Sequence, residues 1–429
     1  MTTSDTGAAV RTKTTKRGAL HGAVLVAGGL AVAQVFSYLL SLISAKVLGP
    51  DGYGVMGAML NLILVGNVLA LGIQAAGARR IVLMDATNRP RVGAGVLRAA
   101  LVAGILVFVV TALLSPIFTS LLHLSSFMLI LLVAANLYPA TVYGGLLGVS
   151  QGREAHARFA IVCALTGSGR AVGGIAGVLA GKSVTMALTG MLAGSIAGVL
   201  IAWLLTKPLV AKPPMRLENF RSDVLHATHA LFALFVLTNM DVLLARHFLT
   251  PTQAGMYAAG SIVAKVTFWL PQVVAMVAYP RLADHRRSST LGLAALAVIA
   301  IGLVATGMIA LLKNVVVQFV GGSAYAGLAS EVWVFAAAGS AFGLAQFLLY
   351  SQIAASKRAA IVVLWLAVAS LVVVVWRFHS SVLQIASCVL CVALAVSLVG
   401  MIELLIERQR EPERAERKQK APTGAAGVS

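Results

Sequence analysis

The stretch from Leu249 to Arg281, LTPTQAGMYAAGSIVAKVTFWLPQVVAMVAYPR, contains a turn, a long apolar segment with a lysine near its middle, and a basic end. An earlier stretch from Leu48 to Arg80, LGPDGYGVMGAMLNLILVGNVLALGIQAAGARR, has the same layout. A shift of 201 positions superimposes identical residues: Leu48 on Leu249, Pro50 on Pro251, Gly54 on Gly255, Ala58 on Ala259 and Arg80 on Arg281. We therefore interpret the chain as two related halves, and we expect any functional site at their junction.

The composition indicates a membrane protein. The chain has 429 residues, of which 59% are hydrophobic and only 11% are charged. A soluble domain needs more charge than this to cover its surface. Within a bilayer the backbone must satisfy its own hydrogen bonds, so only helices or closed barrels span it. The apolar runs are about 20 residues long, which is the length of a membrane-spanning helix and twice that of a barrel strand.

The pattern predicts an all-α polytopic membrane protein with about twelve transmembrane helices. We expect these spans at residues 20–45, 53–77, 93–115, 125–148, 159–181, 183–206, 224–248, 254–278, 290–312, 330–354, 359–377 and 382–406. The connecting loops are short, and none is long enough to form a separate extramembrane domain.

The basic residues predict the orientation. With the N-terminus in the cytoplasm, 26 of the 33 Lys and Arg residues fall on the inner side, five fall outside, and two lie within spans. Such an excess of cations marks cytoplasmic loops, so both termini are expected in the cytoplasm of a bacterial cell, with the protein in its cytoplasmic (inner) membrane. The basic loops also account for the net charge of +19 by contact with anionic membrane lipids, without a nucleic-acid partner.

A proline-rich basic segment divides the chain. Residues 207–221, KPLVAKPPMRLENFR, contain three prolines and four cations, and prolines interrupt helices. Six spans on each side mean that both halves enter the membrane from the same face, so the two six-helix bundles are related by a parallel pseudo-two-fold repeat. The expected organisation is a cytoplasmic basic tail (1–19), an N-terminal bundle (20–206), a cytoplasmic linker (207–222), a C-terminal bundle (223–406) and a charged tail that is disordered or lies on the membrane surface (407–429).

Two cations are expected near the middle of the bilayer. Arg170 lies in the fifth span and Lys265 in the eighth. A charged side chain at that depth costs about 2.5–3.5 kcal/mol on insertion scales, and it is tolerated where it faces a wet cavity or an anion. One interpretation is a cationic, substrate-binding cavity between the halves; the other is that each cation pairs with a neighbouring helix.

Other polar residues are candidates for the same cavity. Asp241 is the clearest acid within a span, and it either pairs with Lys265 or Arg170 or carries a coupling proton. Trp269 could stack on a sugar ring but could equally be a packing residue. The possible lining residues, each of which could instead form a helix–helix hydrogen bond, are Trp269, Gln272, Asn239, Asn67, Gln74 and Asn136.

Several site types are missing from the sequence. There is no G-x-x-x-x-G-K-[ST] motif, no loop with paired carboxylates or a Ser/His/Asp set, and no His/Cys/Asp cluster with metal spacing. Cys388 and Cys391 form a C-x-x-C, but on a membrane helix we interpret them as packed small residues. We therefore predict no catalytic residues, no enzyme activity, no cofactor and no metal.

Three segments resemble a known group of proteins. They are AKVLGPDGYG (45–54), its echo ARHFLTPTQAGMYAAG (245–260) and FWLPQVVAMVAYPRLAD (268–284). They resemble the bacterial oligosaccharide and polysaccharide flippases (polysaccharide transporter family) of the multidrug/oligosaccharidyl-lipid/polysaccharide exporter superfamily. The resemblance implies translocation of an undecaprenyl-diphosphate-linked glycan across the cytoplasmic membrane by alternating access, with a glycan polymerase or glycosyltransferases as further partners.

Two other functions remain open on the sequence. A cation-coupled multidrug exporter of the same superfamily is expected to need buried acids, of which this chain has few. A non-transporting membrane scaffold for polysaccharide or cell-wall assembly would recruit its partners through the basic C-terminal tail.

Overall fold

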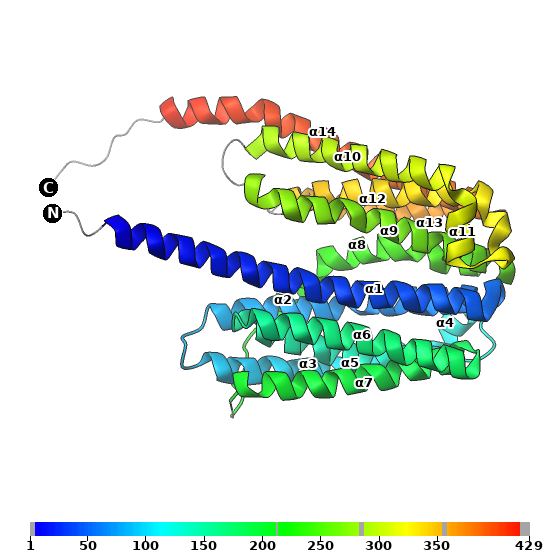
Figure 1. Cartoon of the computed structure of the whole chain (residues 1–429), viewed down its shortest axis with the longest axis horizontal. Helices are drawn as coiled ribbons and strands as arrows, with labels where there is room; N and C mark the ends of the chain where they lie inside the picture. Colours follow the sequence, from blue (N-terminus) through cyan, green and yellow to red (C-terminus); the bar gives the residue numbers. More distant parts are fainter. Residues whose placement is uncertain (1–4, 212, 283–286, 354–357, 421–429) are drawn as a thin grey trace. The chain divides into compact units, whose positions relative to one another are not determined.

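The computed structural model of the chain describes residues 5–211, 213–282, 287–353 and 358–420. In these ranges the protein consists of helices and short loops and has no strand, which confirms the all-helical prediction (Figure 1). The elements are α1 (Asp5–Gly66), α2 (Val68–Val82), α3 (Arg89–Leu113), α4 (Ser115–Leu121), α5 (Met128–Gly152), α6 (His156–Gly181), α7 (Val184–Thr206), η1 (Lys207–Leu209), α8 (Phe220–Phe248), α9 (Pro251–Leu282), α10 (Arg287–Leu311), α11 (Lys313–Val320), η2 (Ser323–Ser330), α12 (Val332–Ile353), α13 (Arg358–Arg377) and α14 (Val382–Lys420).

The element α1 is two helices joined at a sharp bend. Gly49 has φ 65° and ψ 179°, and Pro50 follows it. Glycine reaches a positive φ without a steric penalty, and proline has no N–H to donate within a helix. The bend separates the first predicted span from the second, which runs from Pro50 through a break at Asn67 and ends with α2.

A long helix lies at each of the twelve predicted spans. By length and composition, eight helical segments of the described residues could cross a membrane, and one of them, Val24–Val82, holds two predicted spans because it includes the bend at Gly49. These eight segments cover nine of the twelve predicted spans. At the remaining three lie α12 with the preceding η2, the shorter apolar helix Ile361–Arg377, and α9. The short elements α4, α11 and η2 were not predicted.

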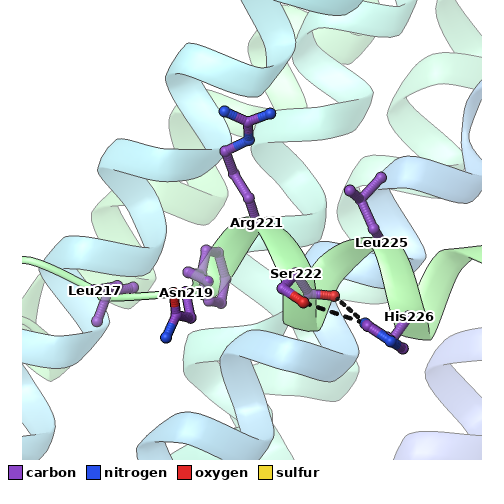
Figure 2. A pocket seen from close by; sticks show the side chains of 7 residues that line it. Leu217, Asn219, Arg221, Ser222, Leu225 and His226 are labelled. Carbon is purple, nitrogen blue, oxygen red and sulfur yellow. Dashed lines mark hydrogen bonds between the residues drawn. The ribbon is translucent and has the colours of Figure 1, made fainter.

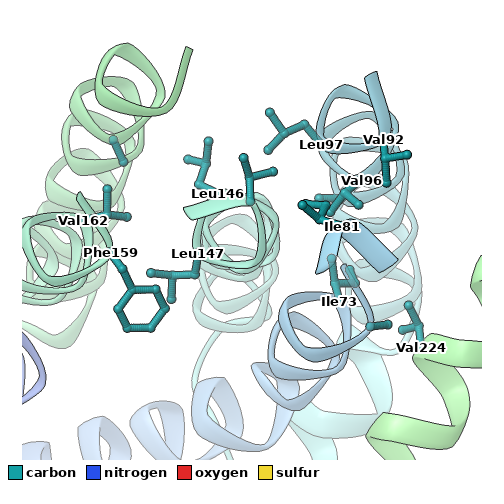
Figure 3. Close-up of a cluster of buried hydrophobic side chains, with 14 of the residues drawn as sticks. Ile73, Ile81, Val92, Val96, Leu97, Leu146, Leu147, Phe159, Val162 and Val224 are labelled. Atoms are coloured by element: carbon teal, nitrogen blue, oxygen red, sulfur yellow. The ribbon is translucent and has the colours of Figure 1, made fainter. Parts of the chain in front are cut away.

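The chain divides into two compact units, Met1–Ala259 with Phe319–Ala324, and Gly260–Gln318 with Tyr325–Ser429. The predicted bundle bounds at 206 and 223 are not tested by this division and stay a prediction. In the first unit, α6 packs against α1 and α7, and α5 packs against α2, α3 and α7. A buried apolar cluster joins six of its helices (Figure 3); its members include Ile73, Ile81, Val92, Val96, Leu97, Leu146, Leu147, Phe159, Val162, Ala202 and Val224.

The closest helix pair of the first unit is α6 with α7, which lie side by side in Figure 1. A Cβ added to Gly173 would collide with the carbonyl oxygen of Gly190, and one added to Gly194 would collide with that of Gly169. These glycines, Gly169 and Gly173 on α6 and Gly190 and Gly194 on α7, therefore let the two backbones touch, as small residues do between membrane helices. It packs one helix on another and leaves no room there for a ligand.

The linker is ordered against the start of α3. The backbone N–H of Ala211 donates to the carbonyl of Pro90 at 3.1 Å, and that of Met215 donates to Arg91 at 3.0 Å. The Arg91 side chain donates to the carbonyl of Pro213 at 3.3 Å. These bonds satisfy backbone N–H and carbonyl groups of the linker, whose prolines prevent it from forming a helix.

The second unit is built around α12, which packs against α10 and α14. The hydroxyl of Thr267 on α9 donates to the carbonyl of Ala336 at 3.0 Å, and that of Ser397 on α14 donates to Ala341 at 2.8 Å. Both acceptors are on α12, so hydroxyl groups connect two neighbouring helices to it.

Equivalent residues of the two repeats contact each other where α9 begins. A Cβ on Gly54 would lie 2.9 Å from the backbone nitrogen of Gly255, and one on Gly57 would lie 2.7 Å from the Cβ of Ala258. Each pair is separated by the 201 positions found in the sequence. The two stretches therefore meet at equivalent positions, and this contact belongs entirely to the first unit.

Candidate functional site

Arg170 lies near the middle of α6, and its neighbours along the helix pack tightly on α1. The closest α1 contacts are those of Gly167 with Ala33 and of Gly174 with Leu40, so they bracket Arg170 along the helix. Ala171 is buried and Arg170 itself is half-buried. The guanidinium group is thus held inside the first unit rather than at either helix end.

The surroundings of Arg170 are polar but not acidic. The phenol of Tyr143 on α5 interacts with it electrostatically, and the same phenol lies beside Cys163 and Thr166 of α6. Positions 163, 166 and 170 share one face of a helix. Within the described part of the chain Arg170 forms no salt bridge and no hydrogen bond, so the predicted pairing of Asp241 with Arg170 does not occur there.

Asp241 is buried in the C-terminal half of α8 and accepts a hydrogen bond from the hydroxyl of Tyr257 at 3.0 Å. Tyr257 belongs to the motif ARHFLTPTQAGMYAAG but was not among the predicted residues. Asn239, two residues before it on the same helix, donates to the carbonyl of Phe235 at 2.8 Å. The amide group of Asn239 is therefore used in part within its own helix.

Three other predicted lining residues lie in the first unit. Asn67 lies at the break between α1 and α2, and its side-chain oxygen is buried without a hydrogen-bond partner among the described residues. Asn136 donates to the carbonyls of Leu132 and Leu188, and so joins α5 to α7. Gln74 donates to Gln151 at 3.0 Å. Asn136 and Gln74 thus form helix–helix hydrogen bonds, while the side-chain oxygens of both Asn67 and Asn136 are buried acceptors without a partner among the described residues.

The remaining predicted residues lie on α9 in the second unit. Lys265 is half-buried, and Trp269 is 43% exposed, with its ring edge-on to Phe268. The side chain of Gln272 lies outside the described residues. Because Arg170 and Lys265 belong to different units, their shared cavity stays a prediction.

A cluster at the C-terminal end of α8 was not predicted from the sequence. The buried Arg246 donates to the carbonyls of Leu122 and His123 at 3.1 and 3.3 Å. The Nδ1 of His247 lies 2.7 Å from the carbonyl of Leu121, and its ring stacks on that of His123. The last turn of α8 thus caps three successive carbonyls at the C-terminal end of α4, those of Leu121, Leu122 and His123. The sequence signal was Arg246 beside His247 before the turn, but Arg246 was counted only among the five cations predicted to lie outside.

No family model matches the chain, and no curated protein matches it. Among solved structures, an inward-facing multidrug resistance MATE family transporter of the MOP superfamily is similar with a TM-score of 0.69 and 13% identity, covering 90% of this chain and 99% of the other. The chain has the fold of the MATE transporters.

Two further structures with this fold are informative. An outward-facing multidrug resistance MATE family transporter is similar with a TM-score of 0.64 and 13% identity, over 90% of this chain and 95% of the other. A MOP superfamily transporter from Pyrococcus furiosus, described as having a binding pocket of reverse polarity that suggests a different function, is similar with a TM-score of 0.55 and 15% identity, over 89% of this chain and 95% of the other. The MATE fold of two helical bundles confirms the predicted fold class, and together with the apolar helices it makes the chain a multi-pass integral membrane protein.

Proposed function

We propose that the protein is a membrane transporter that works by alternating access and carries an anionic, lipid-linked oligosaccharide across the bacterial cytoplasmic membrane. The observation that supports this cargo is Arg170, a cation inside a bundle of membrane helices with no carboxylate partner among the described residues. A cation so placed is expensive in a membrane unless an anion or water meets it. The diphosphate of a lipid-linked sugar is such an anion.

The fold is compatible with the mechanism. The similar MATE structures include an inward-facing and an outward-facing state, and a shared fold permits the same exchange in this chain. In our proposal the Arg170 guanidinium attracts the diphosphate, Tyr143 donates beside it, and Lys265 supplies the second cation from the other unit. The lipid tail stays in the bilayer, and the two termini stay in the cytoplasm with the enzymes that make the glycan.

The second candidate is multidrug export, and the similarity to multidrug resistance transporters favours it. A drug exporter that takes cationic drugs needs an acid at its site. Asp241 is the acid available within a span of the first unit, and it lies in the C-terminal half of α8, where it accepts a hydrogen bond from Tyr257. Increased resistance to cationic dyes on overexpression, lost in Asp241→Asn, would favour this candidate.

The deciding experiment compares Arg170→Ala and Lys265→Ala with the control Arg158→Ala, whose cation lies in the first turn of α6. We expect surface glycan to fall at least tenfold in each of the first two variants at equal protein level, and to be unchanged in the control. Arg170→Lys keeps the charge and should retain more export than Arg170→Ala. Full export by both Ala variants would refute the cationic cavity.

A scaffold role is tested separately by removing the residues after Arg408. Loss of complex formation with intact export would mean that the tail recruits partners while the helices transport.

A further inference from the structure

An arginine and a histidine line the pocket at the start of α8, but they do not face one ligand. Figure 2 shows Arg221 and His226 on opposite sides of the helix. Their spacing of five residues agrees with this view, since it turns the second side chain by about 140° from the first. A site for a small anion needs its donors on one side. Such a set lies within the first unit, between α5, α6 and α7.

The set consists of Arg170, Tyr143 and a serine of α7, Ser195. Ser195 is only 7% exposed, and its hydroxyl has no hydrogen-bond partner among the described residues. On the same helix, the hydroxyls of Thr189 and Thr206 donate to carbonyls one turn earlier. The hydroxyl oxygens of Ser195 and Tyr143 are not sealed from solvent. Ser195 therefore offers an unused polar group inside the bundle.

Ser195 lies at the level of Tyr143. On the preceding turns, Asn136 of α5 donates to the carbonyl of Leu188 of α7 at 3.1 Å. The helices α5 and α7 run in the same direction, because each is joined to α6 by only a few residues. Tyr143 follows Asn136 by seven residues, and Ser195 follows Leu188 by seven. Seven residues make almost two turns and about 10.5 Å, so Tyr143 and Ser195 repeat the same facing arrangement.

Arg170 and Ser195 lie on the same side of the contact between α6 and α7. The backbones of Gly169 and Gly194 touch, and Arg170 and Ser195 are the next residues along each chain. In two antiparallel helices, the residues that follow such a contact turn toward the same side of the plane that contains both axes. That side holds α5, because Tyr143 lies beside Arg170.

We infer that Arg170, Tyr143 and Ser195 form one oxyanion site inside the first unit, and that it receives a phosphate group of the lipid-linked cargo. No carboxylate among the described residues pairs with Arg170, and its guanidinium can donate charge-assisted hydrogen bonds to phosphate oxygens. The two hydroxyls add donors from the two neighbouring helices. The inference rests on the proposed function for the identity of the cargo. It adds Ser195 to the site and assigns the phosphate contact to one unit.

The test measures binding of geranyl diphosphate, a soluble diphosphate with a short isoprenyl chain, to the full-length protein in neutral detergent. Geraniol and inorganic diphosphate are the comparison ligands. We expect geraniol to bind at least tenfold more weakly than geranyl diphosphate. Ser195→Ala and Tyr143→Phe each remove one hydroxyl, and each should weaken geranyl diphosphate binding about tenfold, because hydrogen bonds to charged groups are among the stronger ones.

The matched control is Ser168→Ala, which removes a hydroxyl two residues before Arg170. The Ser168 hydroxyl donates to the carbonyl of Ala164 in its own helix, and its position is turned by about 160° from that of Arg170. This variant should bind geranyl diphosphate as the wild type does. Unchanged binding in Ser195→Ala, or equal losses in Ser195→Ala and Ser168→Ala, would overturn the inference. Inorganic diphosphate that binds as tightly as geranyl diphosphate would overturn the assignment of a lipid-linked ligand.

The surface-glycan assay separates this inference from the proposed function. Lost export in Arg170→Ala, together with unchanged diphosphate binding in Ser195→Ala, would refute the three-residue site and leave the proposed function standing. Full export by Arg170→Ala and Lys265→Ala, together with weakened diphosphate binding in Ser195→Ala, would leave the oxyanion site standing and refute its cargo.

Discussion

Thr252 donates a hydrogen bond to Asp51 over 2.6 Å, and the two residues occupy the same position in the two repeats, 201 residues apart. The Asp51–Thr252 pair is followed by the contacts of Gly54 with Gly255 and of Gly57 with Ala258, so the two stretches meet position by position at the start of α9. The contact is close because glycine occupies the second of these three equivalent positions in both repeats, at Gly54 and Gly255.

The first prediction concerns this contact during transport. In a cysteine-free background, Asp51→Cys with Thr252→Cys should form a disulfide on oxidation, because the hydrogen bond places the two side chains within reach of each other. If the contact opens in the alternating-access cycle, export should stop in the oxidised protein and return after reduction. The single-cysteine variants under the same oxidant serve as controls. Unchanged export by the fully cross-linked protein would mean that this contact stays closed throughout the cycle.

The second prediction concerns the backbone contact of α6 with α7. Gly173→Ala should destabilise the protein by about 1–3 kcal/mol because its Cβ would push the two helices apart. Gly28→Ala is the matched control, since a Cβ there meets no atom within 4 Å and alanine favours a helix by about 1 kcal/mol. Thermal unfolding in one detergent compares the two. A Gly173→Ala variant as stable as Gly28→Ala would contradict the packing described above.

The third prediction concerns Arg246, which caps the carbonyls after α4 while buried. Hydrogen bonds to charged groups contribute about 1.5–3 kcal/mol each, so Arg246→Met should lower the free energy of unfolding by about 2–4 kcal/mol. Arg216, an exposed cation of the linker, should change stability by less than about 0.5 kcal/mol on substitution with Met. Proteolysis between α4 and α5 should accelerate only in the Arg246 variant.

The fourth prediction concerns the ion pair of Arg80 with Asp223. Their side chains are 28% and 41% exposed, and exposed ion pairs contribute about 0–1 kcal/mol. A double-mutant cycle with Arg80→Gln and Asp223→Asn should therefore give a coupling energy within that range, and it should shrink as salt is raised. A coupling above about 2 kcal/mol, insensitive to salt, would show that the pair is desolvated in the membrane-embedded protein.

The sequence predicted the helices better than their connections. Apolar length and cation placement are properties of the chain alone, so all twelve long helices could be located. The bend at Gly49 and Pro50 was also marked by residues that helices avoid. In contrast, α4 and α11 are short helices of seven and eight residues, and a pattern that short cannot be separated from a loop.

The candidate site residues were chosen by their position within predicted membrane spans, because a sequence does not show which side chains contact each other. The sequence placed Arg170 within an apolar helical segment, but it could not reveal the neighbouring Tyr143, because a tyrosine in an apolar run gives no signal of what it faces. Asp241 was expected beside a cation, and its contact with Tyr257 could not be foreseen from spacing along one helix. Arg246 was misjudged because carbonyl acceptors belong to every residue and so leave no mark in a sequence.

The glycine contact between α6 and α7 has a practical consequence for spectroscopy. Two helices whose backbones touch along several turns have no room to slide past each other, so we expect α6 and α7 to move as one rigid body whenever the protein changes state. Spin labels on their lipid-facing sides would keep a fixed separation in every state. The distance between these two labels would serve as a fixed reference against which the displacement of any other helix can be measured.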